Sequence, residues 1–287
     1  MVIHYNYSHF CEDQFRQLLR KENEMKKLKA PMLALLMLLS VDTFAMDNKQ
    51  LAFQLTTLFR SSRSIVTKNK PFIGNPRESL KGESPDDFII SFLIQTKKIY
   101  KKTTGSRFPP TDDTPEGVLR GHLIDSIVSV IIKAVKGQYE GVFKYSPATH
   151  FKKGVNVYDN KFLPARYAVE VMKEFNARTE GKALLKLTAP DKLLVKRSNA
   201  PDEWEKKILN SIFSKAGYER GSPFSEVTTY KGQKAFRQLL PEYYKKGCIG
   251  CHGAEAGQNG PNIHQSGKGY PLKTLGGGIS IIILMDG

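Results

Sequence analysis

The chain has 287 residues, 40% of them hydrophobic, and a formal net charge of +16 at pH 7. This length allows one or two domains with a substantial core, and the composition is not that of a disordered protein. The three cysteines are too few for a disulfide framework. The positive charges are scattered and accompany no nucleic-acid motif. We therefore interpret them as a solvated basic surface, suited to an acidic protein partner, and expect no nucleic-acid partner.

Residues 25–45 have the three-part pattern of a secretory signal peptide. A basic segment, 25–29, precedes an apolar segment, 30–39, and small residues follow up to Ala45. This order favours a signal peptide over a buried apolar helix, and the apolar part is too short for a membrane anchor. Because a signal peptide begins its protein, we expect residues 1–24 to be an extension from a misassigned gene start. No later stretch has ~18 unbroken apolar residues, so we expect no stable membrane span in the mature chain.

Apolar residues at helical spacing predict four helices between the signal peptide and the middle of the chain. The predicted helices are 46–70, 85–103, 115–136 and 162–179. Pro85 and Pro115 fall in first turns, where proline is well tolerated. The proline-rich stretch 108–115 predicts a boundary between a helical N-terminal region, 46–114, and a second domain, 115–287.

Strand patterns dominate the C-terminal part of the chain. The predicted elements are a strand at 183–188, a helix at 201–213, a hairpin of 227–230 and 235–239, and a last strand at 278–284. We expect the glycine-rich stretch between the hairpin and the last strand to be a loop. An order of helices first and strands later predicts an α+β fold with an antiparallel sheet.

Cys248-Ile249-Gly250-Cys251-His252 has the spacing of a c-type haem attachment motif. The two thiols would form thioethers to one covalent haem c, and His252 would bind the iron. A structural zinc site would need a second Cys/His pair, and only His264 follows. A thioredoxin-like redox pair would lie between a strand and a helix, and four glycines around the motif disfavour a helix. Covalent haem attachment in bacteria takes place outside the cytoplasm, so export and the motif together predict a periplasmic protein.

Several further segments occur with this motif in a characteristic order. They are 162–168, 197–205, 237–241, 248–253 and 269–281. In this order and spacing the chain, from about residue 115 to its end, resembles the Tll-like family of c-type haem domains, long catalogued as a domain of unknown function. The resemblance implies a PAS-like antiparallel sheet with flanking helices and a haem at one side. It also implies a periplasmic redox or gas sensor that works with a sensor kinase or receptor.

The second axial position of the iron has several candidate ligands. These are His122, His150, Met172 and His264, or an open position filled by water or a small diatomic gas. We name His122 as the candidate protein ligand and expect Met172 to pack in the core. Some family members are thought to use a cysteine from an early helix, but the helix predicted at 115–136 contains none. Arg197 and Arg166 are candidate partners of the haem propionates.

Three functions fit a haem motif of this kind. The first is a redox or small-gas sensing module, and the alternative is a periplasmic electron-transfer cytochrome. The third, which we rank last, is an enzyme such as a haem peroxidase. Small cytochromes place the motif early with a methionine ligand well downstream, whereas here the motif is late and only Met285 follows. Helical-bundle cytochromes do place it late, but on a helix. Nothing supplies a distinctive distal His/Arg pair of a peroxidase, so we predict that the protein is not an enzyme.

Overall fold

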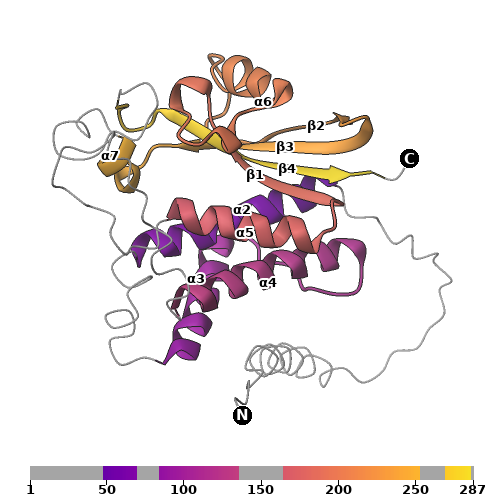
Figure 1. The fold of residues 1–287 in the computed structure, drawn as a ribbon, viewed down its shortest axis with the longest axis vertical. Helices are drawn as coiled ribbons and strands as arrows, with labels where there is room; N and C mark the ends of the chain where they lie inside the picture. The colour runs from indigo at the N-terminus through magenta and orange to yellow at the C-terminus, as the bar shows by residue number, and fades with distance from the viewer. Residues whose placement is uncertain (1–47, 70–83, 136–163, 253–268, 286–287) are drawn as a thin grey trace, which may run out of the picture. The chain divides into compact units, whose positions relative to one another are not determined.

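The computed structural model of the protein describes residues 48–69, 84–135, 164–252 and 269–285 (Figure 1). By internal contacts the chain separates into two units, Met1–Ala45 and Met46–Gly287. The predicted signal peptide and the extension before it lie outside the described residues. The boundary expected near residue 114 stays a prediction. In the described part of the chain, no helix is both long enough and apolar enough to cross a membrane.

The four predicted helices of the first part of the chain are confirmed. They are α2 (Asn48–Lys68), α3 (Pro85–Thr104), α4 (Pro115–Val135) and α5 (Pro164–Arg178). Local chemistry sets the ends of α3: the Ser84 hydroxyl accepts a hydrogen bond from the amide of Asp87, and Gly105, at φ 76°, closes the helix by donating to the Lys101 carbonyl. Glycine suits this last position because side chains disfavour positive φ.

Four antiparallel strands form one sheet in the order β1-β4-β3-β2. The strands are β1 (Ala183–Thr188), β2 (Phe224–Tyr230), β3 (Gln233–Tyr243) and β4 (Leu275–Leu284). In Figure 1 helices α2 and α5 lie along one face of the sheet, and α6 (Glu203–Lys207) lies on the other. The predicted α+β class, with an antiparallel sheet flanked by helices and preceded by a helical region, is confirmed.

Strand β3 links the two layers through the alternation of its side chains. Gln238 is fully buried and donates to the Thr56 hydroxyl of α2 at 3.0 Å. Its neighbour Arg237 points to the other face and donates to Asp202, the residue that caps α6, at 2.7 Å. Because successive strand side chains point to opposite faces, one dipeptide attaches the sheet to both of its neighbouring layers.

The prediction of a loop around the cysteine motif is wrong for Lys246–His252, which form a short helix, α7. Each glycine costs about 1 kcal/mol relative to alanine in a helix, but tertiary contacts outweigh that cost. Gly247 packs against α2, where a Cβ would lie 3.2 Å from the Thr67 methyl group. Gly247 therefore permits the close packing of α7 on α2. Because the motif lies on a helix, its glycines count against neither a redox pair nor a helical cytochrome.

Candidate functional site

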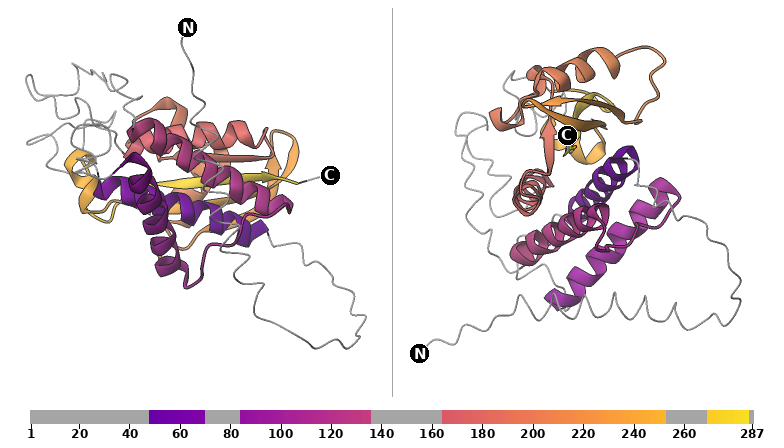
Figure 2. Two further views of the ribbon diagram at one scale, coloured as in Figure 1. Left: turned by 90° about the horizontal axis from the view of Figure 1, so that it is seen from below. Right: turned by 90° about the vertical axis from the view of Figure 1, so that its right-hand side faces the viewer.

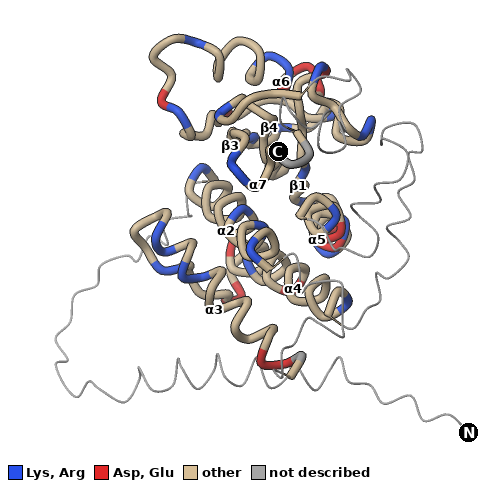
Figure 3. Tube along the Cα trace, turned by 90° about the vertical axis from the view of Figure 1, so that its left-hand side faces the viewer, with Lys and Arg blue, Asp and Glu red and all other residues tan. Residues whose placement is uncertain are grey.

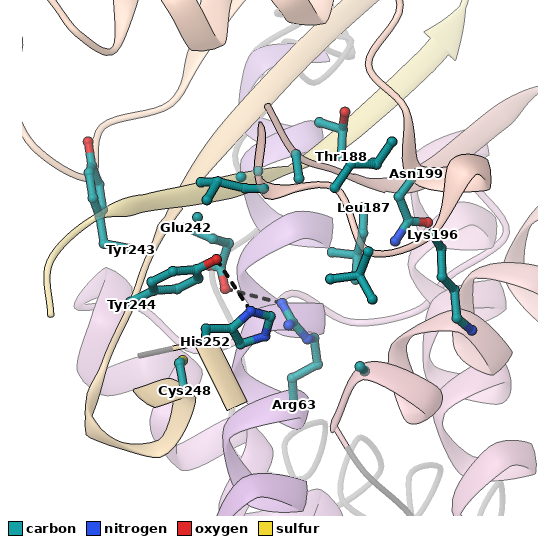
Figure 4. A pocket seen from close by; sticks show the side chains of 18 of the residues that line it. Arg63, Leu187, Thr188, Lys196, Asn199, Glu242, Tyr243, Tyr244, Cys248 and His252 are labelled. Carbon is teal, nitrogen blue, oxygen red and sulfur yellow. Dashed lines mark hydrogen bonds and ion pairs between the residues drawn. The ribbon is translucent and has the colours of Figure 1, made fainter. Parts of the chain in front are cut away.

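A cavity of about 220 Å³ lies where α7 meets the end of the sheet (Figure 4). Its wall combines α2, α5, the segment after β1, the end of β3, α7 and the start of β4. Two residues of the predicted motif, Cys248 and His252, line it. Cys248 is a free, partly buried thiol, and Cys251 lies on the same helix.

Most of the wall opposite α7 is apolar. Alanine, valine and leucine side chains provide it: Ala165, Val169, Leu187, Leu193, Leu194 and Val195. They come from α5, from β1 and from the turn that follows β1, so distant parts of the sequence build one surface. A wall of this kind, with a few polar groups, is typical of sites for organic ligands and cofactors.

Tyr244 holds the imidazole of His252. Its hydroxyl lies 3.3 Å from Nδ1, and the two rings stack with centroids 4.9 Å apart. Burial raises the pKa of Tyr244, so the hydroxyl stays protonated at neutral pH. Since Nδ1 faces Tyr244, a metal bound by this ring would be bound by Nε2. Such a second hydrogen bond fixes the orientation of a histidine ligand.

Gly276 makes room for this tyrosine. A Cβ at Gly276 would lie 2.3 Å from Tyr244 Cε1, so no side chain fits there. The backbone of Tyr244 is also fixed, because its amide donates to the Thr274 carbonyl and its carbonyl accepts from the Lys273 amide, both at 2.9 Å. The glycine run at the start of β4 thereby sets the position of the ring that orients His252.

Glu242 fastens α2 to the end of β3 beside the cavity. One carboxylate oxygen accepts from Arg60 Nε at 2.5 Å and the other from Arg63 Nη1 at 3.1 Å. Arg60 also donates to the Pro241 carbonyl at 2.6 Å. Burial by itself would raise the pKa of Glu242, but the charges of the two arginines lower it below its usual range. We call these three residues the Glu242 clamp.

The wall near the turn after β1 is positively charged. Burial, followed by the nearby charges of Arg166 and Lys173, lowers the pKa of Lys196, which lines the cavity. Arg166 is paired with Glu170 at 2.7 Å. A cation that is partly buried beside other cations is stabilised by an anion, so this corner favours a carboxylate or phosphate group.

The other predicted site residues lie elsewhere. Arg197, the predicted propionate partner, is exposed and does not line the cavity, whereas its neighbour Lys196 does. His122 lies partly exposed on α4, also away from the lining. Met172 is buried in the core of α5, which confirms the packing role expected for it. His150 and His264 lie outside the described residues. No group of three or more His, Cys, Asp or Glu residues that could hold a metal ion occurs among the residues described.

Of the stretch 199–205, Asn199 lines the cavity, whereas Asp202 and Glu205 belong to a buried ion network on the other face of the sheet. Glu205 is fully buried, closes the capping box with Asp202 and accepts from Lys186 Nζ at 2.7 Å. The Arg237 guanidinium lies 4.3 Å from the ring centroid of Trp204. This network holds α6 to the sheet, and its role is structural.

Sequence reasoning missed Tyr244, Lys196 and the Glu242 clamp. The available signals were weak: a Glu-Tyr-Tyr run directly after a strand, and a glycine run before the last strand. Neither indicates which side chains meet, because the contacts of Glu242 with α2 span about 180 positions of sequence.

Residues 88–283 match the model of a known protein family, described as Tll0287-like. The match extends from α3 into β4 and covers more than half of the chain. Neither the curated proteins nor the solved structures contain a match to this chain.

Proposed function

The chain belongs to the Tll0287-like family, and from that premise we propose that it is an exported protein with one covalent c-type haem that acts as a redox- or small-gas-sensing module. One observation carries the proposal: Cys248 and His252 of the Cys-x-x-Cys-His motif line the same largely apolar cavity. A chance motif on a surface loop would have no reason to face such a cavity.

The described residues fit a haem in three respects. The apolar wall suits a macrocycle, the Lys196 corner suits propionates, and Tyr244 is placed to orient His252. The cavity is smaller than the roughly 300–1,000 Å³ of pockets that enclose a whole ligand. A haem here would therefore be only partly enclosed by the described residues. One exposed edge is suitable for a partner protein or for a small ligand.

Haem supplies an iron centre that changes oxidation state or binds a diatomic ligand. The chain's own residues would tether it through Cys248 and Cys251 and ligate it through His252 Nε2. Tyr244 would keep the imidazole in one tautomer and orientation, and Lys196 would neutralise a propionate. The Glu242 clamp would hold the α2 side of the cavity in place.

A sensing role is supported by the chemistry of the described cavity wall. Among the lining side chains that the structure describes, there is no methionine and no second histidine. The usual second ligand of a pure electron-transfer haem is not offered by this wall. An exchangeable second position would let water or a small gas bind, and a sensor kinase or receptor would read the change.

Electron transfer is the second candidate, and the helix α7 favours it. The motif lies on a helix, as in helical cytochromes, so the objection from its glycines is removed. The helix also removes one objection to a Cys-x-x-Cys redox pair without haem, because such a pair is expected next to a helix. However, α7 connects two antiparallel strands, β3 and β4, and not the parallel strands of a βαβ unit.

The decisive experiment is expression of the full chain in a bacterium that carries cytochrome c maturation proteins. We expect a red periplasmic protein whose mass is increased by one haem and whose haem survives denaturation. Cys248→Ala and Cys251→Ala should each lose a thioether, while Val227→Ala, at an exposed position on β2 outside the cavity lining, serves as the control and should keep both. A colourless protein with both motif thiols free, or joined as a disulfide, would overturn the proposal.

Spectra of the same protein separate the two haem functions. Binding of CO to the reduced form, or a five-coordinate spectrum, supports sensing. A six-coordinate low-spin spectrum that CO leaves unchanged supports electron transfer and refutes an exchangeable position.

A further inference from the structure

Helix α3 exposes two large aliphatic side chains on its outer side. Ile90 is 43% exposed and Ile94 is 61% exposed. The opposite side of the helix packs against α2 and α4, and Figure 2 shows α3 at the outside of the helical layer. Isoleucines at i and i+4 are neighbours on the helix surface and form a small contiguous apolar patch.

The charges on α3 are divided between its two ends. Asp86 and Asp87 lie in the first turn, and Lys97, Lys98 and Lys101 lie in the last two turns. Figure 3 shows acidic residues at the N-terminal end of this helix and basic residues toward the other end. At about 100° per residue, these charged residues lie on the same side of the helix as the two isoleucines.

We propose that α3 binds the α3 of a second copy of this chain in antiparallel orientation, about a two-fold axis near residue 92. In that register Ile90 of one copy faces Ile94 of the other. Asp86 then faces Lys98 and Asp87 faces Lys97, and the two-fold axis makes each contact twice. The helix sequence is therefore complementary to its own reversed copy, which is the requirement for a symmetric dimer.

The charges select this arrangement over its alternatives. A parallel pair of α3 helices would place aspartates beside aspartates and lysines beside lysines, which repel. A uniformly acidic partner would match the lysine end but would meet Asp86 and Asp87 at the other end. A second copy of the chain satisfies both ends at once.

The expected contact is small. A helix of 20 residues is about 30 Å long and about 10 Å wide, so each copy contributes on the order of 300 Å². Stable complexes bury about 800 Å² per partner. The dimer is therefore weak and reversible, and because its ion pairs are exposed it weakens with added salt.

The first test compares two aliphatic-to-acid substitutions in the full chain. Sedimentation equilibrium over a concentration series should show a monomer–dimer equilibrium for the native sequence. Ile94→Asp should raise the dissociation constant at least tenfold. Val227→Asp should leave it unchanged, because Val227 is also exposed, at 52%, but lies on β2. A monomer at every concentration, or an equal effect of both substitutions, would refute the α3 contact.

The second test exchanges the charges. D86K/D87K carries only positive charges at the four positions and K97E/K98E only negative ones, so each variant should be monomeric. Mixed together, they should form a heterodimer about as tight as the native dimer, because the four facing pairs are again attractive. Circular dichroism and unfolding temperature confirm that each variant is folded. If the folded variants stay monomeric when mixed, the antiparallel register is wrong.

Discussion

Replacing Glu242 by glutamine tests whether the Glu242 clamp joins α2 to the sheet through charge. The substitution keeps the size of the side chain and one carbonyl acceptor, but it removes the negative charge that faces Arg60 and Arg63 at 2.5 and 3.1 Å. Glu242 is 28% exposed, so the pair of contacts lies between a surface ion pair, worth about 0–1 kcal/mol, and a buried pair, whose disruption costs about 3–5 kcal/mol. We expect a loss of about 2 kcal/mol in the free energy of unfolding at pH 7.

The pH dependence gives the sharper test. The pKa of Glu242 is lowered in the folded protein, so its stabilisation is present above the unfolded value of about 4.3. It is lost as pH falls through the lower folded pKa. The difference between the native chain and Glu242→Gln should be constant between pH 5 and pH 7, and it should shrink steadily below about pH 4.

Urea unfolding followed by circular dichroism at several pH values measures this difference. Glu203→Gln is the matched control, because Glu203 pairs with Lys206 but is 91% exposed; we expect a change within about 0.5 kcal/mol. Equal stability of the native chain and Glu242→Gln at pH 7 would refute the clamp. A difference that persists unchanged in acid would show that packing, and not charge, is responsible.

Three further predictions follow from the described contacts. Arg237→Met should cost about 3 kcal/mol in urea unfolding, because it leaves the fully buried Glu205 without one of its cations. Gly276→Ala should cost about 1–3 kcal/mol, since its Cβ would overlap the ring of Tyr244; wild-type stability would refute the close packing. In the haem-bound form that we propose, Tyr244→Phe should keep the covalent haem but weaken the binding of His252 to the iron by about 10–100-fold. Absorbance titration should then show ligand loss at a pH about 1–2 units higher, and an unchanged midpoint would mean that Tyr244 does not orient the ligand.

Much of the fold could be predicted from local patterns. The strand at 183–188 has the same bounds in the structure as in the prediction. Helices α3, α4 and α5 each begin at a proline, because within a helix proline is well tolerated only in the first turn. The helix α7 could not be predicted, because its glycines disfavour a helix locally. Only the Thr67 contact explains why glycine is suitable at Gly247.

Some residues of the candidate site could likewise be predicted from the sequence, and others could not. Cys248, Cys251 and His252 could be singled out because their chemistry depends on spacing along the chain. Tyr244, Lys196 and Arg63 could not, because their roles come from contacts with residues far away in sequence. Arg197 and His122 show the converse: their residue types suit haem chemistry, but the structure places them outside the cavity lining.

The sequence by itself determined the order of helices and strands, the α+β class, the position of the cysteine motif and the resemblance to the family. These depend on periodicity and spacing, which act over a few residues. The tertiary structure alone decided that β4 lies between β1 and β3, that the ends of β3 and α2 are fastened at Glu242, and that the motif faces an apolar cavity. Such contacts join residues far apart in the chain, and they form only when burial of the whole core outweighs the entropy of ordering the segments between them.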